Sequence, residues 1–220
     1  MAKKQYAVIG LGRFGSSLAT ALYEAKNEVI GIDINEERVE EFHQDLSQAV
    51  IADSTDKQSM KSLGITNFDV VIVAMGDDMQ SSIFTVVVLK ELGVQYIVAK
   101  ALDNRHGAIL SKVGADQVVY PERDMGLRVA QKLMQPNIIE YIQLSKEYSI
   151  EEIMIPSLIV GKTLKELDVR ARFNVNVIAI RHHDEKVTIA PGPDFIFKDH
   201  DSLVVIGQNN DLKEFAKFNS

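Results

Sequence analysis

Short apolar runs alternate with amphipathic segments along the first 135 residues of the chain. The run Asp69–Met75 is rich in β-branched residues, as is typical of a parallel strand buried on both faces. The segments between the runs have apolar residues at helical spacing. Six such alternations predict a doubly wound parallel sheet. Strands are expected at 6–9, 28–32, 48–52, 69–75, 95–99 and 117–120, and helices after the first strand and at 35–42, 56–63, 80–92, 104–113 and 125–134.

A different pattern begins beyond the last of these helices. Gln135-Pro136-Asn137 breaks the helix, and the apolar stretch Ile138–Leu144 fits neither helix nor strand clearly, so we interpret it as a connector. The remainder predicts a small α+β unit, which is too small to bury much core alone and is expected to pair with a copy of itself. Its strands are expected at 150–155, 176–181, 186–189 and 202–206, and its helices at 163–172 and 210–218. The predicted domains are 1–136 and 149–220, joined by 137–148.

Three glycines separate the first predicted strand from the first helix. Gly10, Gly12 and Gly15 have the G-x-G-x-x-G spacing, in which the first permits a tight turn, the second lets a pyrophosphate approach and the third lets helix and strand pack closely. The helix N-terminus then offers free N–H groups to an anion. The second strand ends in Asp33, where a carboxylate can accept hydrogen bonds from ribose hydroxyls. The motif therefore predicts a bound adenine nucleotide.

Further polar residues follow the other strands of this predicted sheet. Ligands of such sheets bind at the carboxyl ends of the strands, where the strand order reverses. Arg13 and Lys100 would supply the added positive charge that ATP needs beyond a dinucleotide's pyrophosphate. Asp33 disfavours NADP but does not distinguish NAD from ATP. The residues expected at this rim are Arg13, Asp33, Asp53, Ser54, Gly76, Asp77 and Lys100.

Composition excludes several classes of function. The chain of 220 residues has a formal net charge of −7, which argues against a general affinity for nucleic acid or anionic membranes. It has no Cys, so disulfides, thiolate metal sites and Cys nucleophiles are excluded. No apolar run approaches the ~20 residues of a membrane helix, and the N-terminus has no apolar signal region.

Catalysis has little support in the sequence. The five histidines are expected at the surface, because no Asp or Glu has a spacing that would orient any of them as a base; they are His43, His106, His182, His183 and His200. No phosphate-binding loop for nucleotide hydrolysis is present. Glu122 and Asp124 lie at the start of a helix, where their charges either interact favourably with the helix dipole or form a cation site. Arg170, Arg172 and Arg181 flank an apolar strand and could meet a second anionic ligand, although the interpretation as solvated edge residues is favoured.

Two sets of motifs resemble a known pair of domains. Gly10–Gly15, Ala52-Asp53, Ala99-Lys100-Ala101 and Tyr120-Pro121-Glu122 resemble the RCK (KTN) domain, a Rossmann-like domain that regulates potassium conductance. Four further segments resemble its C-terminal companion, RCK_C (TrkA_C). The length of the chain is similar to that of the cytosolic subunits of bacterial Ktr potassium uptake systems. These segments are Gly161–Leu167, Asn176–Arg181, Pro191–Asp194 and Asp201–Gly207.

The resemblance implies a regulatory subunit and not an enzyme. It implies an octameric ring of four dimers, cytoplasmic and docked beneath a membrane potassium-translocating subunit, and gated by ATP against ADP. Arg13 and Lys100 would reach the terminal phosphate, and Glu122 would bind a cation (Mg²⁺, Ca²⁺ or Na⁺) between dimers. The nucleotide-binding set it implies is Gly10, Gly12, Arg13, Phe14, Gly15, Asp33, Asp53, Ser54, Gly76, Asp77 and Lys100. Cyclic di-AMP would bind at the RCK_C dimer interface, near Arg170, Asn176 and Ile178.

Two other functions remain open from the residues. One is an NAD(H)-binding module, either redox-sensing or a small dehydrogenase, which tighter binding of NADH than of ATP would favour. The other is a purely structural dimerisation protein, which the absence of any nucleotide binding would favour.

Overall fold

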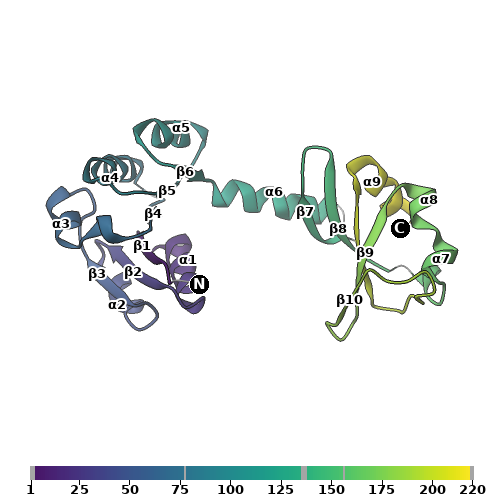
Figure 1. The fold of residues 1–220 in the computed structure, drawn as a ribbon. Helices are drawn as coiled ribbons and strands as arrows, with labels where there is room; N and C mark the ends of the chain where they lie inside the picture. Colours follow the sequence, from purple (N-terminus) through teal and green to yellow (C-terminus); the bar gives the residue numbers. More distant parts are fainter. Residues whose placement is uncertain (1–2, 77, 135–137, 156, 219–220) are drawn as a thin grey trace. The chain divides into compact units, whose positions relative to one another are not determined.

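The computed structural model describes residues 3–76, 78–134, 138–155 and 157–218. The chain divides into two compact units, Met1–Asp124 and Met125–Ser220 (Figure 1). Within the described residues, no helix is both long and apolar enough to cross a membrane.

The first unit contains the predicted parallel sheet. Its six strands lie in the order β3-β2-β1-β4-β5-β6, so the order reverses between β1 and β4, which are paired in parallel. This arrangement confirms the doubly wound, Rossmann-like fold. The strands are β1 (Gln5–Ile9), β2 (Glu28–Asp33), β3 (Gln48–Ile51), β4 (Val70–Val73), β5 (Ile97–Lys100) and β6 (Gln117–Val119).

Helices follow each strand, and the sheet has an apolar cluster on each face. Ile9, Ile32 and Val73 belong to one cluster, and Val8 and Ile72 to the other, because neighbouring residues in a strand point to opposite faces. The helices are α1 (Arg13–Glu24), α2 (Glu36–Glu41), α3 (Lys57–Ser62), η1 (Ile65–Asn67), α4 (Met79–Leu92) and α5 (Asn104–Val113), and α6 (Pro121–Met134) begins in this unit and continues into the second.

The second unit is built on an antiparallel sheet of five strands in the order β10-β9-β11-β8-β7. Its strands are β7 (Ile138–Gln143), β8 (Tyr148–Met154), β9 (Asn176–Arg181), β10 (Val187–Ile189) and β11 (Ser202–Gln208). Its helical segments are η2 (Ser157–Ile159), α7 (Leu164–Leu167), α8 (Val169–Phe173) and α9 (Asn209–Phe218). The core includes Ile153 and Val205 of the sheet and Leu212 and Phe215 of α9, all fully buried.

Two elements of this unit differ from the sequence prediction. The apolar stretch interpreted as a connector forms β7, an edge strand paired with β8. Its sequence does not alternate strictly between apolar and polar residues: Tyr141 packs against the core while its neighbour Ile142 is exposed, so the pairing with β8 decides the strand. The helix expected over 163–172 is two helices, α7 and α8. Asp168 between them has φ +45°, a left-handed conformation that ends a helical turn.

Candidate functional site

A cavity of about 660 Å³ opens at the carboxyl ends of the strands of the first sheet. It lies where the strand order reverses, which is the expected ligand position in an open α/β sheet. Of the residues predicted from the sequence, seven line it: Gly10, Gly12, Arg13, Asp33, Asp53, Ser54 and Gly76. Asp77 lies outside the described residues.

The geometry at Gly10 and Gly15 agrees with the turn and close-packing roles that the spacing predicts, and Gly12 has open space above it. Gly10 has φ +95°, which favours glycine in a tight turn. A Cβ added at Gly15 would lie 1.8 Å from the backbone oxygen of Gly10, so α1 packs against the turn more closely than a side chain permits. The atom nearest to a Cβ added at Gly12 would be Nη1 of Arg38, at 4.0 Å. The space above Gly12 is therefore open to the cavity.

The N-terminus of α1 is available to an anion. Its N-cap, Gly12, provides no side-chain hydrogen bond, whereas Asn35, Asp56, Asp78 and Asp103 cap the next four α-helices through their side chains. The first-turn N–H groups of α1 therefore lack the side-chain acceptor that satisfies such groups elsewhere.

Arg13 adds a full positive charge at this helix N-terminus. Its side chain is exposed and lines the cavity, and its guanidinium has no ion-pair partner in the part of the chain that the structure describes. A free guanidinium beside free N–H groups is suited to bind a phosphate through charge-assisted hydrogen bonds.

Asp33 holds the glycine turn as well as facing the cavity. Its Oδ2 accepts a hydrogen bond from the Leu11 N–H at 2.7 Å, and its Oδ1 accepts one from the Asn35 N–H at 2.9 Å. The carboxylate is buried. Oδ2 is also 3.5 Å from Nη1 of Arg38, whereas Oδ1 retains a lone pair, so the ribose role predicted for Asp33 is compatible with this structural one.

Asp53 and Ser54 lie at the end of β3. Asp53 accepts hydrogen bonds from the N–H and the hydroxyl of Thr55 at 2.9 and 2.7 Å. Ser54 is buried and shares a hydrogen bond of 2.8 Å with Thr85 of α4. These contacts fix the loop after β3 at the cavity wall.

Lys100 lies behind the cavity wall rather than in its lining. A Cβ added at Gly76 would lie 2.9 Å from Lys100 Nζ, so the missing side chain of Gly76 leaves room for the ammonium group. Lys100 is buried and donates a hydrogen bond of 2.5 Å to Glu122 Oε1. Its Nζ is also 5.7 Å from the centroid of the Phe14 ring. The fold thus gathers Phe14, Gly76, Lys100 and Glu122 in one place.

This ion pair also changes the acidity of Glu122. The hydrogen bond from Lys100, with a further contribution from the charge of Arg13, holds the pKa of the Glu122 carboxyl below its usual value. Glu122 therefore remains a carboxylate at neutral pH, with one oxygen hydrogen-bonded to Lys100. Among the described residues, no group of three or more His, Asp or Glu is arranged to hold a metal ion.

Residues proposed for a second ligand lie in the C-terminal unit. Arg170 is exposed on α8, Asn176 is exposed at the start of β9, and Ile178 is half-buried in β9. Arg170 is the second residue of α8, and a short connection separates the end of that helix from Asn176.

The expectation that all five histidines lie at the surface is wrong for His106, and the expectation that no acidic residue orients any of them is wrong for His182. His106 is fully buried, and its Nδ1 accepts a hydrogen bond from the Leu102 N–H at 3.3 Å. Burial lowers the pKa of His106, partly opposed by the charge of Asp103. The neutral ring is therefore part of the buried face of α5.

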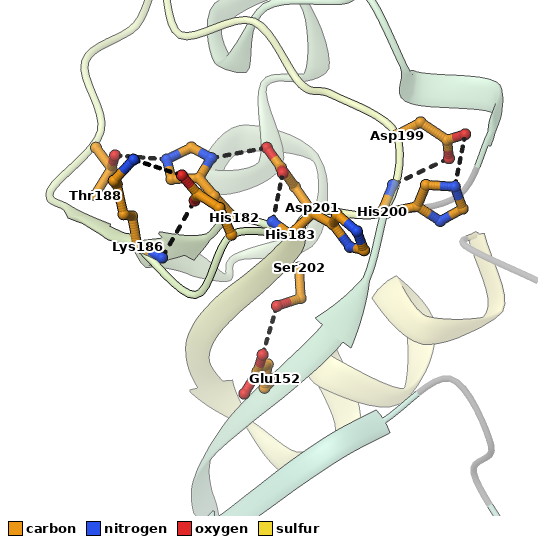
Figure 2. Close-up of polar contacts among 10 residues, drawn as sticks. Glu152, His182, His183, Lys186, Thr188, Asp199, His200, Asp201 and Ser202 are labelled. Carbon is orange, nitrogen blue, oxygen red and sulfur yellow. Dashed lines mark hydrogen bonds and ion pairs between the residues drawn. The ribbon is translucent and has the colours of Figure 1, made fainter.

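His182 is the second exception, and an acidic residue does orient it. Its Nδ1 is 3.0 Å from Oδ2 of the buried Asp201, and its Nε2 is 2.8 Å from Oγ1 of Thr188. Figure 2 shows the imidazole between these two side chains. Asp201 is nineteen residues away in the sequence, and only the pairing of β9 with β11 brings the two together. The contacts hold the β9–β10 turn against the start of β11.

The cavity also has lining residues that the sequence analysis missed. Ile34, Arg38, Glu41 and Phe42 come from α2 and the turn before it, and Asp78 and Ser81 from the first turn of α4. The sequence signal for the first group was its place directly after the acidic end of β2, where a helix must begin beside the ribose position.

Comparison with known proteins gives two family matches that together cover most of the chain. A model described as the TrkA-N domain matches residues 6–121, and one described as the TrkA-C domain matches residues 150–220.

Curated relatives match over almost their full length. The chain is 46% identical over 215 residues to Ktr system potassium uptake protein C of Bacillus subtilis (strain 168), covering 98% of this chain and 97% of that protein. It is 42% identical over 212 residues to Ktr system potassium uptake protein A of the same organism, covering 96% and 95%. Among solved structures, the GsuK channel has a TM-score of 0.71 at 18% identity, with all of this chain aligned to 40% of the channel chain. That likeness supports the fold alone.

Proposed function

Because the chain belongs to the TrkA-N and TrkA-C family of Ktr system potassium uptake proteins, we propose that it is a nucleotide-gated regulatory subunit of potassium transport. In this proposal it is a cytoplasmic protein and not an enzyme. It binds the inner face of the cell membrane through a potassium-translocating partner, and ATP and ADP set its state.

The observation that supports nucleotide binding most strongly is the uncapped N-terminus of α1 on the cavity. It is accompanied by the unpaired guanidinium of Arg13 and by the buried carboxylate of Asp33. A phosphate group at the helix N-terminus and a ribose at Asp33 would use all three features.

Gating requires that two ligands bind differently. A ligand shifts an equilibrium between two conformations only by its difference in affinity for them. ATP differs from ADP by its terminal phosphate, and Arg13 and Lys100 are the cations proposed to contact it. Lys100 is already paired with Glu122, so a terminal phosphate would compete with Glu122 for the ammonium group. A cation bound by Glu122 near the phosphates would relieve that competition.

We expect Arg13→Ala to weaken ATP binding about 10- to 100-fold and ADP binding less than about 3-fold, since a hydrogen bond to a charged group contributes roughly 1.5–3 kcal/mol. Isothermal titration of ATP, ADP and NADH into both proteins measures this. Arg105→Ala, which removes an exposed charge outside the cavity lining, is the control.

Other outcomes of the same titration identify the alternatives. Tight NADH binding that Arg13→Ala leaves unchanged would favour an NAD(H) module over the gated subunit. No binding of any of the three nucleotides to the wild-type protein would favour a structural dimerisation protein.

The assembly and the second ligand are also proposed. We expect a mass in light scattering of about eight chains of 24.5 kDa, and one cyclic di-AMP bound per two chains, near Arg170, Asn176 and Ile178. Exposed Arg170 offers positive charge to a phosphodiester. A mass that stays at one or two chains contradicts the ring, and wild-type affinity for cyclic di-AMP in Arg170→Ala contradicts this placement of the ligand.

A further inference from the structure

Arg38 has a position at the cavity that neither the glycine motif nor the acidic strand end accounts for. It lies in the first turn of α2, where its N–H donates a hydrogen bond of 3.2 Å to the side chain of Asn35. That cap fixes the direction of the turn. The side chain extends back toward the cavity, and its Nη1 is 3.5 Å from Asp33 Oδ2. The same Nη1 is the atom nearest to a Cβ built on Gly12.

The contact with Asp33 leaves most of the guanidinium unused. The Arg38 side chain is 47% exposed, and the 3.5 Å separation is at the long limit for a hydrogen bond. Asp33 already accepts two backbone hydrogen bonds, so it does not need Arg38 to be satisfied. Ion pairs of this kind contribute little to stability. About half of the Arg38 side chain is therefore accessible to another partner.

The surroundings of Arg38 indicate which partner that is. Ile34 is 70% exposed, and it lines the cavity together with the apolar residues Phe42 and Ala52 and the charged residue Glu41. The phosphate end, at the uncapped α1 and Arg13, is polar, and Nη1 of Arg38 lies near both Asp33 and Gly12. An aromatic base fits an apolar wall and a guanidinium plane, because arginine stacks on aromatic faces.

We propose that Arg38 binds the adenosine half of the nucleotide, with its guanidinium stacked on the base beside Asp33. The inference rests on the proposed nucleotide binding and assigns Arg38 a role separate from that of Arg13. Arg38 contributes equally to every adenine nucleotide, whatever its number of phosphates. Arg13 contributes more as phosphates are added.

The test is a titration of AMP, ADP and ATP into wild type, Arg38→Ala, Arg38→Lys and the control Arg105→Ala. We expect Arg38→Ala to weaken all three ligands by the same factor, about 3- to 30-fold, the range of a partly desolvated cation–π contact. Arg38→Lys keeps the charge but loses the planar fork, so it should recover little of the loss. Arg105→Ala should bind as wild type does.

Three results would overturn the proposal. A loss that grows from AMP to ATP and is restored by Arg38→Lys would make Arg38 a phosphate-binding charge. Unchanged affinities in Arg38→Ala, with wild type binding normally, would leave it no ligand role. If the wild-type protein binds none of the three nucleotides, the proposed function itself fails. The titration of the wild-type protein alone shows this outcome.

Discussion

Gly15→Ala is expected to destabilise the first unit by at least about 3 kcal/mol, the upper end of ordinary overpacking. The added Cβ would lie 1.8 Å from the Gly10 oxygen and 3.0 Å from the Ala74 Cβ. The first of these atoms is backbone within the tight turn, so it cannot rotate away as a flexible side chain would. Either α1 moves away from the sheet or the turn opens. Urea denaturation followed by circular dichroism measures the loss, and wild-type stability in this variant would contradict the close packing.

Gly12→Ala is the matched control, since it makes the same chemical change three residues away. The atom nearest to the added Cβ is Nη1 of Arg38, at 4.0 Å. The fold should therefore retain its stability to within about 1 kcal/mol, the ordinary size of a Gly-to-Ala effect in a helix. The methyl group instead enters the space that a pyrophosphate would approach. Folded protein with lost ATP affinity is the expected result.

Glu151→Gln is expected to stabilise the C-terminal unit above pH 7 and to have little effect near pH 4. Glu151 lies on β8 opposite Tyr141 of β7 and Val205 of β11. It is 5% exposed, and its Oε2 has no hydrogen-bond partner among the described residues. Burial raises the pKa of the carboxyl from 4.5 to about 7, partly opposed by the charge of Lys213 on α9.

The sign of the pH dependence follows from that direction. Because the pKa is higher in the folded state, folded protein holds this proton more tightly than the unfolded chain does. The favourable contribution is fully present below about pH 4.5 and is lost as the pH rises to about 7. At 1.36 kcal/mol per pKa unit, the loss is about 3 kcal/mol. A neutral glutamine removes this dependence.

Thermal denaturation at pH 5 and pH 8 measures the effect, with hydrogen exchange of β8 and β11 locating it in the C-terminal unit. Glu147→Gln, which neutralises an exposed carboxylate just before β8, is the control and should leave the pH dependence unchanged. Equal stability changes in the two variants at both pH values would show that Glu151 is not held protonated by burial.

The sequence by itself determined the α/β architecture and the core of the candidate site. Strand and helix periodicities are local, so the six alternations predicted the parallel sheet, and strand ends in such a sheet converge on one edge. The roles of Gly10, Gly12 and Gly15 followed from spacing alone, because the turn geometry restricts what each position accepts. The same logic placed Arg13 and Asp33 at the rim, where both line the cavity.

Only the tertiary structure decided the contacts between residues distant in the sequence. Three features depend on which elements pack together: the ion pair of Lys100 with Glu122, the contact of His182 with Asp201, and the burial of Glu151. Arg38 reaches the cavity only because α2 begins in a capped turn beside Asp33. Periodicity records which face of an element is apolar, but side-chain contacts and desolvation depend on the neighbours that the fold supplies.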